Sequence, residues 1–189
     1  MTDNVRQLTD ARALAALAHP LRRRMLDVLR VYGPSTASQL AERTGQAVGN
    51  ASHHLKVLAA VELVVEAPEL ARDRRERWWR TAGPTRWAGR DFAADESSAA
   101  IERAASAVGI DRQVGFVRAY LAAPEEETRR WPDGPFSTET WLRMTDAELA
   151  AFAAEVIELH RRWADRELPD DGQERRPVFA FARAVPAQP

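Results

Sequence analysis

The sequence contains no cysteine among its 189 residues. A disulfide framework, a thiolate metal site and a cysteine redox switch are therefore excluded. Long apolar runs are also missing, since none approaches the ~20 residues that a membrane-spanning helix needs. The first residues, Met1-Thr2-Asp3-Asn4, lack the basic and apolar regions of a secretory signal. We expect a soluble, cytoplasmic protein with no membrane partner.

Sequence motifs of catalysis are missing as well. There is no phosphate-binding glycine loop, no HExxH and no GxSxG elbow. Glu158, His160 and Asp165 are close together in the sequence, but a lone histidine among charges on a helix surface is usually solvated. The sequence therefore predicts neither an enzyme nor a bound cofactor or metal.

Lysine is scarce, because Lys56 is the one lysine among 27 basic residues. The net charge is −1, which is unusual for a protein that binds nucleic acid. The charge is unevenly divided, however: residues 1–83 carry a balance of +4 and residues 84–189 a balance of −5. This asymmetry fits a nucleic-acid-binding module followed by a region with another role.

Apolar periodicity predicts four helices near the start of the chain, at about residues 5–18, 20–31, 36–44 and 47–60. Thr36 and Gln39 have the spacing of a capping box, which would begin the third helix. Gly45 is placed to end that helix. Two short helices joined by a tight turn with glycine indicate a helix-turn-helix, in which the second helix reads the DNA.

A β-hairpin is predicted directly after these helices. Residues 63–66 and 76–81 are rich in β-branched and aromatic side chains, and the charged segment 71–75 separates them. Trp78 and Trp79 must point to opposite faces of the second strand, so one of them is expected to pack on the core. A helix-turn-helix followed by a hairpin with a basic tip is a winged helix.

Several stretches of the sequence resemble the ArsR-like (arsenic-repressor-like) winged-helix family over about residues 12–83. They are Leu17-Ala18-His19-Pro20-Leu21-Arg22-Arg23-Arg24-Met25-Leu26, Gln39-Leu40-Ala41-Glu42-Arg43-Thr44-Gly45, Ala51-Ser52-His53-His54-Leu55-Lys56-Val57-Leu58, Leu63-Val64 and Arg75-Glu76-Arg77-Trp78-Trp79-Arg80. The resemblance implies a homodimer on a palindromic operator in double-stranded DNA. It also implies that the helix at 47–60 enters the major groove and that the wing at 63–81 follows the backbone.

Metal sensors of that family carry a cysteine motif in the helix that matches residues 36–44. Here the matching helix reads Ala37-Ser38-Gln39-Leu40-Ala41 and has no thiol. We therefore expect a transcriptional regulator that does not sense metal through cysteine.

The side chains of the predicted reading helix are candidates for contact with base edges. They are Gln46, Asn50, Ser52 and His53, because amide, hydroxyl and imidazole groups can pair with bases in the major groove. A side chain at Gly49 could hold the helix away from the groove. The alternative is that some of these residues are solvated or bind phosphate only. His54 is expected to pack inward.

Five basic residues are candidates for phosphate contacts, which position the protein without reading sequence. They are Lys56, Arg72, Arg74, Arg75 and Arg77. The alternative is a solvated charged surface. Arg22, Arg23 and Arg24 could reach the DNA backbone or pair with acids of a partner subunit, and the sequence leaves both open.

The second half, residues 84–189, is predicted to be helical with a short two-stranded sheet. The expected elements are a helix at 96–122 with a kink or break near Gly109 and Gly115, a loop at 124–135, strands at 136–144 and 177–185, and a capped helix at 145–167. The fold class is thus mainly α with a small β component. This region could dimerise, bind a small apolar effector, or do both.

The main alternative function is a winged helix that contacts other proteins and leaves its DNA-facing surface unused. The polar reading helix and the basic wing tip favour DNA binding over this alternative.

Overall fold

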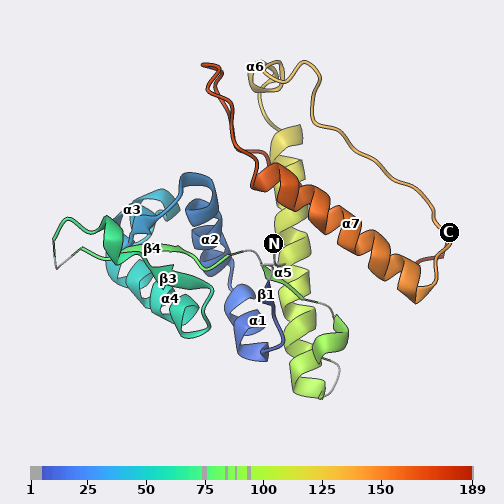
Figure 1. Ribbon diagram of the computed structural model, residues 1–189, viewed down its shortest axis with the longest axis horizontal. Coiled ribbons are helices and arrows are strands. Elements are labelled where there is room, and N and C mark those ends of the chain that lie inside the picture. Colours follow the sequence, from blue (N-terminus) through green and yellow to red (C-terminus); the bar gives the residue numbers. More distant parts are fainter. Residues whose placement is uncertain (1–5, 74–75, 84, 88, 93–94, 189) are drawn as a thin grey trace. The chain divides into compact units, whose positions relative to one another are not determined.

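The computed structural model describes residues 6–73, 76–83, 85–87, 89–92 and 95–188 (Figure 1). The elements follow one another as β1 (Arg6–Gln7), α1 (Ala11–Leu17), α2 (Pro20–Tyr32), β2 (Ser35–Thr36), α3 (Ala37–Thr44), α4 (Val48–Ala60), β3 (Val64–Glu66), the 3-10 turn η1 (Pro68–Leu70), β4 (Trp78–Thr81), β5 (Thr85–Arg86), the 3-10 turn η2 (Gly89–Phe92), α5 (Glu96–Leu121), α6 (Glu125–Thr128) and α7 (Asp146–Ala164).

The chain forms two compact units, Met1–Val114 and Gly115–Pro189. Within the described residues, the buried apolar side chains all lie in the first unit, from Leu8 to Ala105. The sequence predicts a change of role near residue 83, but the first unit continues further along the chain. It does so because Ile101 and Ala105 of α5 pack with the core of the helix-turn-helix.

The core of the first unit is built from the inward faces of α1 to α4. Leu26 and Leu29 of α2, Leu40 of α3, and Leu55 and Leu58 of α4 are at most 3% exposed. Each such leucine removes enough apolar surface from water to contribute about 1.5–3 kcal/mol to folding. The predicted helices at 20–31, 36–44 and 47–60 are confirmed to within one or two residues.

Local signals fix the ends of α3. The Thr36 hydroxyl accepts from the Gln39 backbone N–H at 3.3 Å, and the Gln39 side chain accepts from the Thr36 N–H at 2.8 Å. At the other end, Gly45 adopts the left-handed conformation, with φ of 67°. The predicted capping box and glycine stop are therefore confirmed, and they set the tight turn before α4.

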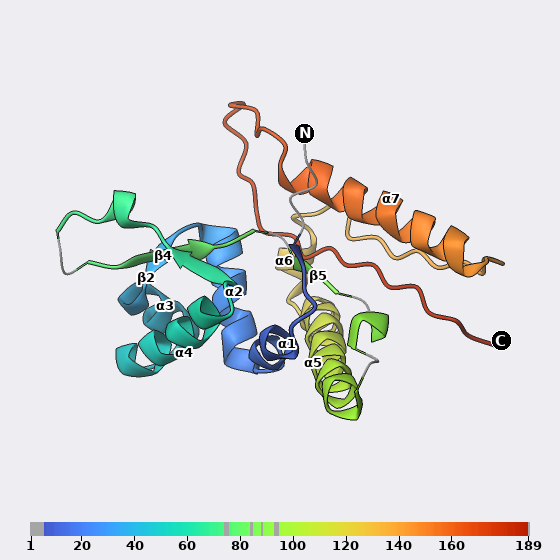
Figure 2. The ribbon, with the colours of Figure 1, turned by 60° about the horizontal axis from the view of Figure 1, so that its bottom comes forward.

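The wing is a three-stranded antiparallel sheet in the order β2-β4-β3. Val64 lies opposite Thr81 and Glu66 opposite Trp79, which confirms the predicted hairpin. Strand β2 was not predicted, because two residues are too few to show a periodic pattern. Figure 2 shows the hairpin extending past α3 and α4.

The first helix differs from the prediction. The expected helix at 5–18 begins only at Ala11, because Asp10 caps it by accepting from the Arg12 N–H at 2.8 Å. Arg6 and Gln7 instead form β1, which pairs in parallel with β5 at Thr85 and Arg86. Val5, at the start of the predicted helix, lies outside the described residues.

The second unit contains the end of α5, then α6 and α7. Thr145 caps α7 with Glu148 in a capping box, as predicted. Helix α5 continues without a break through Gly109 and Gly115, so the expected interruption is absent. The predicted loop at 124–135 includes one helical turn, α6.

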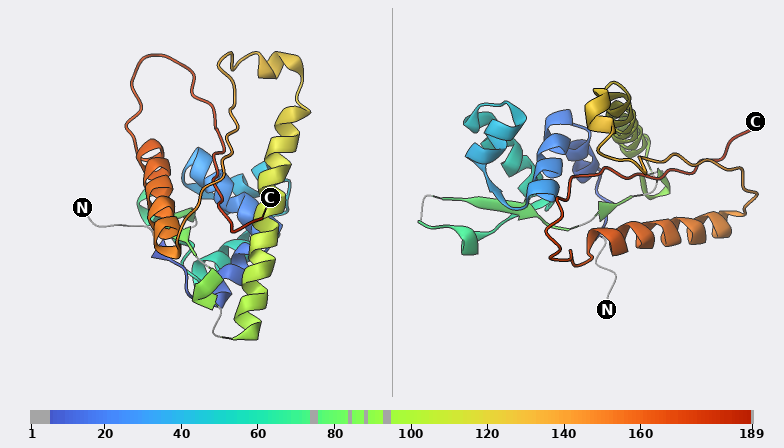
Figure 3. Two further views of the ribbon diagram at one scale, coloured as in Figure 1. Left: turned by 90° about the vertical axis from the view of Figure 1, so that its right-hand side faces the viewer. Right: turned by 90° about the horizontal axis from the view of Figure 1, so that it is seen from above.

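The strands predicted at 136–144 and 177–185 are wrong, and with them the two-stranded sheet of the second half. Both segments are irregular, and Figure 3 shows them as long coils. Phe136, Trp141 and Val178 are 68–90% exposed, so the alternating side chains find no layer to pack on. A two-stranded hairpin without such a layer is at best marginally stable.

Within the described ranges, no helix combines the length and apolar character that crossing a bilayer requires.

The capping box gives a stability prediction. Thr36→Ala removes the hydroxyl that accepts from Gln39, so we expect the free energy of unfolding to fall by about 1 kcal/mol. Urea denaturation followed by circular dichroism measures this change. Thr36→Ser keeps the hydroxyl and serves as the control. Equal stability of the alanine and serine variants would contradict the role of the cap.

Candidate nucleic-acid interface

Helix α4 has one buried and one exposed face. Ala51, Leu55 and Leu58 are fully buried and His54 is 8% exposed. The opposite face is exposed and carries most of the predicted contact residues. Gln46, Gly49, Asn50, His53 and Lys56 are exposed, and Ser52 is half-buried at its edge. The structure therefore brings six of the ten predicted site residues onto one surface, which we call the α4 face.

The N-terminus of α4 has no side-chain cap, since its N-cap residue is Ala47. By contrast, side chains of Asp10, His19 and Thr36 cap α1, α2 and α3. The first backbone N–H groups of α4 can therefore donate hydrogen bonds to another acceptor, and the helix dipole adds partial positive charge there. Such a helix end is suited to a phosphate group.

Two of the predicted base-reading residues bind each other. Asn50 Nδ2 donates to Gln46 Oε1 at 2.8 Å, across one turn at the start of α4. This bond leaves the Asn50 carbonyl as an acceptor and the Gln46 amide group as a donor. The pair therefore presents one acceptor and two or more donors to solvent from a fixed geometry.

Gly49 lies in open space within the α4 face. A Cβ built on Gly49 would meet no atom within 4 Å, and its φ is not positive. Neither packing nor backbone conformation therefore requires glycine here. Glycine nevertheless weakens a helix by about 1 kcal/mol relative to alanine.

Val48 is exposed, whereas the apolar periodicity of residues 47–60 predicts it on the inward face of the helix with Ala51, Leu55 and Leu58. Its exposed fraction is 49%, whereas Ala51 on the next turn is 0% exposed. Val48 precedes the first contact of α4 with the core, so nothing covers it. Sequence periodicity alone groups it with Ala51 and Leu55. An exposed valine at the start of the helix adds an apolar group to the α4 face that the sequence reasoning missed.

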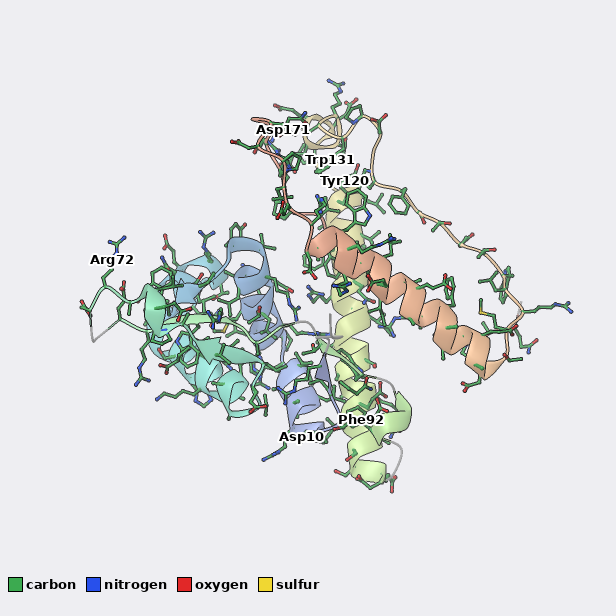
Figure 4. The ribbon with its side chains drawn as sticks, in the orientation of Figure 1. Asp10, Arg72, Phe92, Tyr120, Trp131 and Asp171 are labelled. Atoms are coloured by element: carbon green, nitrogen blue, oxygen red, sulfur yellow. The ribbon has the colours of Figure 1, made fainter. Side chains whose placement is uncertain are left out.

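The tip of the wing is held by short local bonds. Glu76 accepts from the Arg72 backbone N–H at 2.8 Å, which lowers the pKa of the Glu76 carboxyl, and Asp73 accepts from the Glu76 N–H at 3.1 Å. The Arg72 side chain extends outward from this tip (Figure 4). Arg74 and Arg75, both predicted phosphate contacts, lie outside the described residues.

Two wing arginines are engaged within the hairpin. Arg77 lies 3.6 Å from Glu66, and Arg80 pairs with Glu69. Arg77, a predicted phosphate contact, is therefore partly neutralised in this structure. Trp79 is 7% exposed and joins the core, while Trp78 on the other face is half-buried, as expected for neighbouring strand residues.

Two of the three arginines at the start of α2, Arg22 and Arg24, have internal partners. The Arg22 side chain donates to the carbonyls of Ala16 at 2.7 Å and Ala15 at 3.0 Å, at the C-terminus of α1. The Arg24 side chain donates to the carbonyl of Arg43 at 3.3 Å. Both side chains bind backbone carbonyls of helices. The sequence left open contact with the DNA backbone or with acids of a partner subunit, and it did not suggest this internal role.

Two histidines meet beneath the α4 face. The rings of His19 and His54 lie 4.6 Å apart, and His54 Nδ1 is buried without a hydrogen-bond partner among the described residues. His19 Nδ1 accepts from the Leu21 N–H at 3.2 Å and so caps α2. Burial lowers the pKa of both imidazoles, and the nearby Arg22 lowers them further. His54 thus packs inward, as predicted.

Comparison with known families agrees with these elements. A family model described as a helix-turn-helix domain matches residues 17–67, which span α2, α3, α4 and β3. No curated protein matches the chain.

Three solved structures illustrate what the chain is similar to. A crystal structure of a fragment of a possible transcriptional regulatory protein from Mycobacterium bovis is 24% identical, covering 56% of this chain and 89% of that one, with a TM-score of 0.35. A solution structure from the same organism, described as a homodimeric winged helix-turn-helix DNA-binding domain of a possible ArsR-family regulator, is 23% identical over 61% and 83%, with a TM-score of 0.35. A MarR family regulator from Neisseria meningitidis is 18% identical over 74% and 79%, again with a TM-score of 0.35.

The histidine pair predicts a pH dependence of stability. Because the folded state lowers both pKa values, the unfolded chain binds more protons just below its own pKa of about 6.5. The free energy of unfolding should therefore be highest above that pH. It should fall as the pH drops from the unfolded pKa toward the lower pKa values of the folded state. Urea midpoints between neutral and mildly acidic pH measure this.

The control for this prediction is His160→Gln, which alters an exposed histidine of α7. His54→Gln should flatten the pH dependence, whereas His160→Gln should leave it unchanged. The same acid sensitivity in wild type and His54→Gln would show that other groups cause it.

Proposed function

We propose that this chain is a transcriptional regulator of the ArsR-like type that binds double-stranded DNA sequence-specifically. It acts as a homodimer on a palindromic operator and does not sense metal through cysteine. Helix α4 enters the major groove and the wing follows the backbone. The observation that carries the proposal is the α4 face: exposed, polar, uncapped at its N-terminus and centred on a glycine that the fold does not need.

Within the α4 face, Gly49 gives the strongest support for close approach to DNA. Alanine would fit at this position in the first turn of α4 without any clash and is the better helix former, so glycine here lowers stability. Close approach of a DNA groove supplies the missing reason, because a Cβ at this position would separate the helix backbone from the DNA. The uncapped N–H groups at Val48 and Gly49 would then meet a phosphate.

The remaining residues of the α4 face divide by chemistry. The Gln46–Asn50 pair suits adenine, which presents one donor and one acceptor in the major groove. Val48 suits a thymine methyl group. His53 and Ser52 add polar contacts to bases or phosphates, and Lys56 contacts phosphate.

The wing would supply sequence-independent affinity. We assign phosphate contacts to Arg72, Arg74 and Arg75 at the tip. Arg77 contributes less, because it must first give up its ion pair with Glu66.

Homodimerisation is supported by an apolar stripe on α5. Ile110, Val114, Val117 and Leu121 follow the 4-3-4 spacing of a coiled-coil seam and are 38–75% exposed. Arg112 lies on the other side of the helix, where it binds Asp27 of α2. A second copy of α5 would cover the stripe and place two α4 helices around one two-fold axis.

We expect Gly49→Ala to separate stability from DNA binding. The substitution should raise the free energy of unfolding by up to about 1 kcal/mol, because alanine is the better helix former. It should also weaken binding to the selected operator, because the methyl group meets the groove. Urea denaturation and fluorescence anisotropy with a labelled duplex measure the two effects.

Gly115→Ala is the matched control, since Gly115 is an equally open glycine of α5 and lies off the apolar stripe. It should stabilise the helix without changing DNA affinity. If Gly49→Ala binds every duplex as tightly as wild type does, then α4 does not approach DNA at this point.

Substitutions of base-contacting residues and of phosphate-contacting residues should have different effects on DNA binding. Asn50→Ala should weaken binding to the operator roughly 5- to 150-fold and relax selectivity at its base pair. Arg72→Gln should weaken binding to all duplexes alike and reduce the salt slope by about one per subunit. Absence of salt-dependent binding to any duplex would instead favour a winged helix that contacts proteins.

The dimer is tested separately on α5. Val117→Glu places a charge in the apolar stripe and should shift the mass in sedimentation velocity from dimer to monomer. Ala119→Glu adds the same charge on the far side of the helix and should leave the mass unchanged. A dimer that persists in Val117→Glu would place the interface elsewhere.

A further inference from the structure

Three arginines gather where α2 packs on the part of α5 that belongs to the first unit. Arg112 of α5 donates to Asp27 of α2 through Nε at 2.8 Å and Nη2 at 2.5 Å. Arg30 lies 3.8 Å from the same carboxylate. Arg23, one turn earlier on α2, completes what we call the guanidinium cluster. This cluster sets three positive charges against one carboxylate.

The charges in the cluster are not balanced. Burial, together with the positive charges of Arg112 and Arg30, lowers the pKa of Arg23 to about 10, while Asp27 acts in the opposite direction. Burial also lowers the pKa of Arg30. The Asp27 carboxylate binds Arg112 through both oxygens and is also paired with Arg30. Arg23 is thus left without an ion pair of its own among the described residues.

Arg23 packs against defined neighbours, but one of its hydrogen-bond donors has no partner among the described residues. Its guanidinium lies 5.5 Å from the ring centroid of Trp87, and a Cβ on Gly109 would come within 3.4 Å of its Nη2. That distance is an ordinary van der Waals contact, so the guanidinium lies against α5 at Gly109. Yet Arg23 Nε is buried and has no hydrogen-bond partner among the described residues. A buried donor without a partner is costly, so an acceptor is expected.

We propose that the guanidinium cluster is an oxyanion-binding site, which takes a carboxylate or phosphate group beside Arg23. Guanidinium forks match the paired oxygens of such groups. Trp87 forms one wall, and Arg30, whose side chain is 41% exposed, leaves the site open to solvent. The oxyanion comes either from a small anionic molecule or from an acidic side chain of a second copy of this chain.

This site gives the chain a ligand of a different class from the apolar effector that its aromatic content suggests. The site is separate from the α4 face, because its residues belong to α2, α5 and the segment at Trp87. Its occupancy can be measured without DNA. Failure of the DNA-binding proposal would therefore leave the oxyanion site standing, and the reverse also holds.

Thermal unfolding with inorganic phosphate tests the site. Phosphate replaces chloride at constant ionic strength and constant pH, in the full-length protein without DNA. At about ten times its Kd, a bound anion should raise Tm by roughly 3–6 °C for a chain of this size. Arg23→Met, which keeps the aliphatic stem against Trp87, should abolish the rise.

Two further variants make the test independent of folding defects. Asp27→Asn removes the internal carboxylate, so phosphate should raise Tm more than in wild type. Arg12→Gln changes an exposed arginine that pairs with Asp10, outside the cluster, and should respond as wild type does. Lys56→Gln/Arg72→Gln should also respond as wild type, which separates this site from the DNA-binding surface.

Sedimentation velocity distinguishes the two sources of the oxyanion. If the source is a second copy, Arg23→Met should weaken self-association and phosphate should compete with it. If the source is a small anion, self-association should be unchanged in Arg23→Met. An equal phosphate response in wild type, Arg23→Met and Asp27→Asn, with unchanged self-association, would overturn the proposal.

Discussion

The packing of α4 on the helical core is the interaction on which the rest of the first unit depends. Leu55 and Leu58 are fully buried, and removing either side chain would leave a cavity worth about 2–5 kcal/mol. Because a helix has a fixed rotation per residue, burying this side decides which side chains face solvent. The polar groups of α4 are thus placed by the leucines opposite them. The turn at Gly45 only sets where the helix begins.

The sequence allowed most of the first unit to be predicted, because its signals are local. The capping box at Thr36, the left-handed stop at Gly45 and the 3.6-residue periodicity of α2 and α4 each act within a few residues. Errors arose where distant partners decide the structure. Strands β1 and β2 are two residues long and exist only because β5 and β4 lie beside them. Nothing within Arg6–Gln7 indicates such a partner.

In the second unit, local sequence patterns predicted strands that the structure does not contain. Alternating side chains at 136–144 and 177–185 meet the pattern of strands, but the pattern states only what would be buried if a layer were present. Helix α7 could be predicted because Thr145 and Glu148 cap it locally. The candidate site divides in the same way. Exposure of the α4 face follows from periodicity, whereas the guanidinium cluster joins residues 27 and 112 and has no signature in either helix alone.

The hydrogen bond between Gln46 and Asn50 has a consequence for how this surface could change over time. Each amide holds the other in position, so replacing one alters what the other can present. Substitutions at the two positions should therefore be coupled rather than additive. A lineage that adopts a new target sequence would tend to exchange both residues together, and single exchanges would pass through a poorly ordered intermediate. Variation at positions 46 and 50 among descendants of this chain should accordingly occur in pairs.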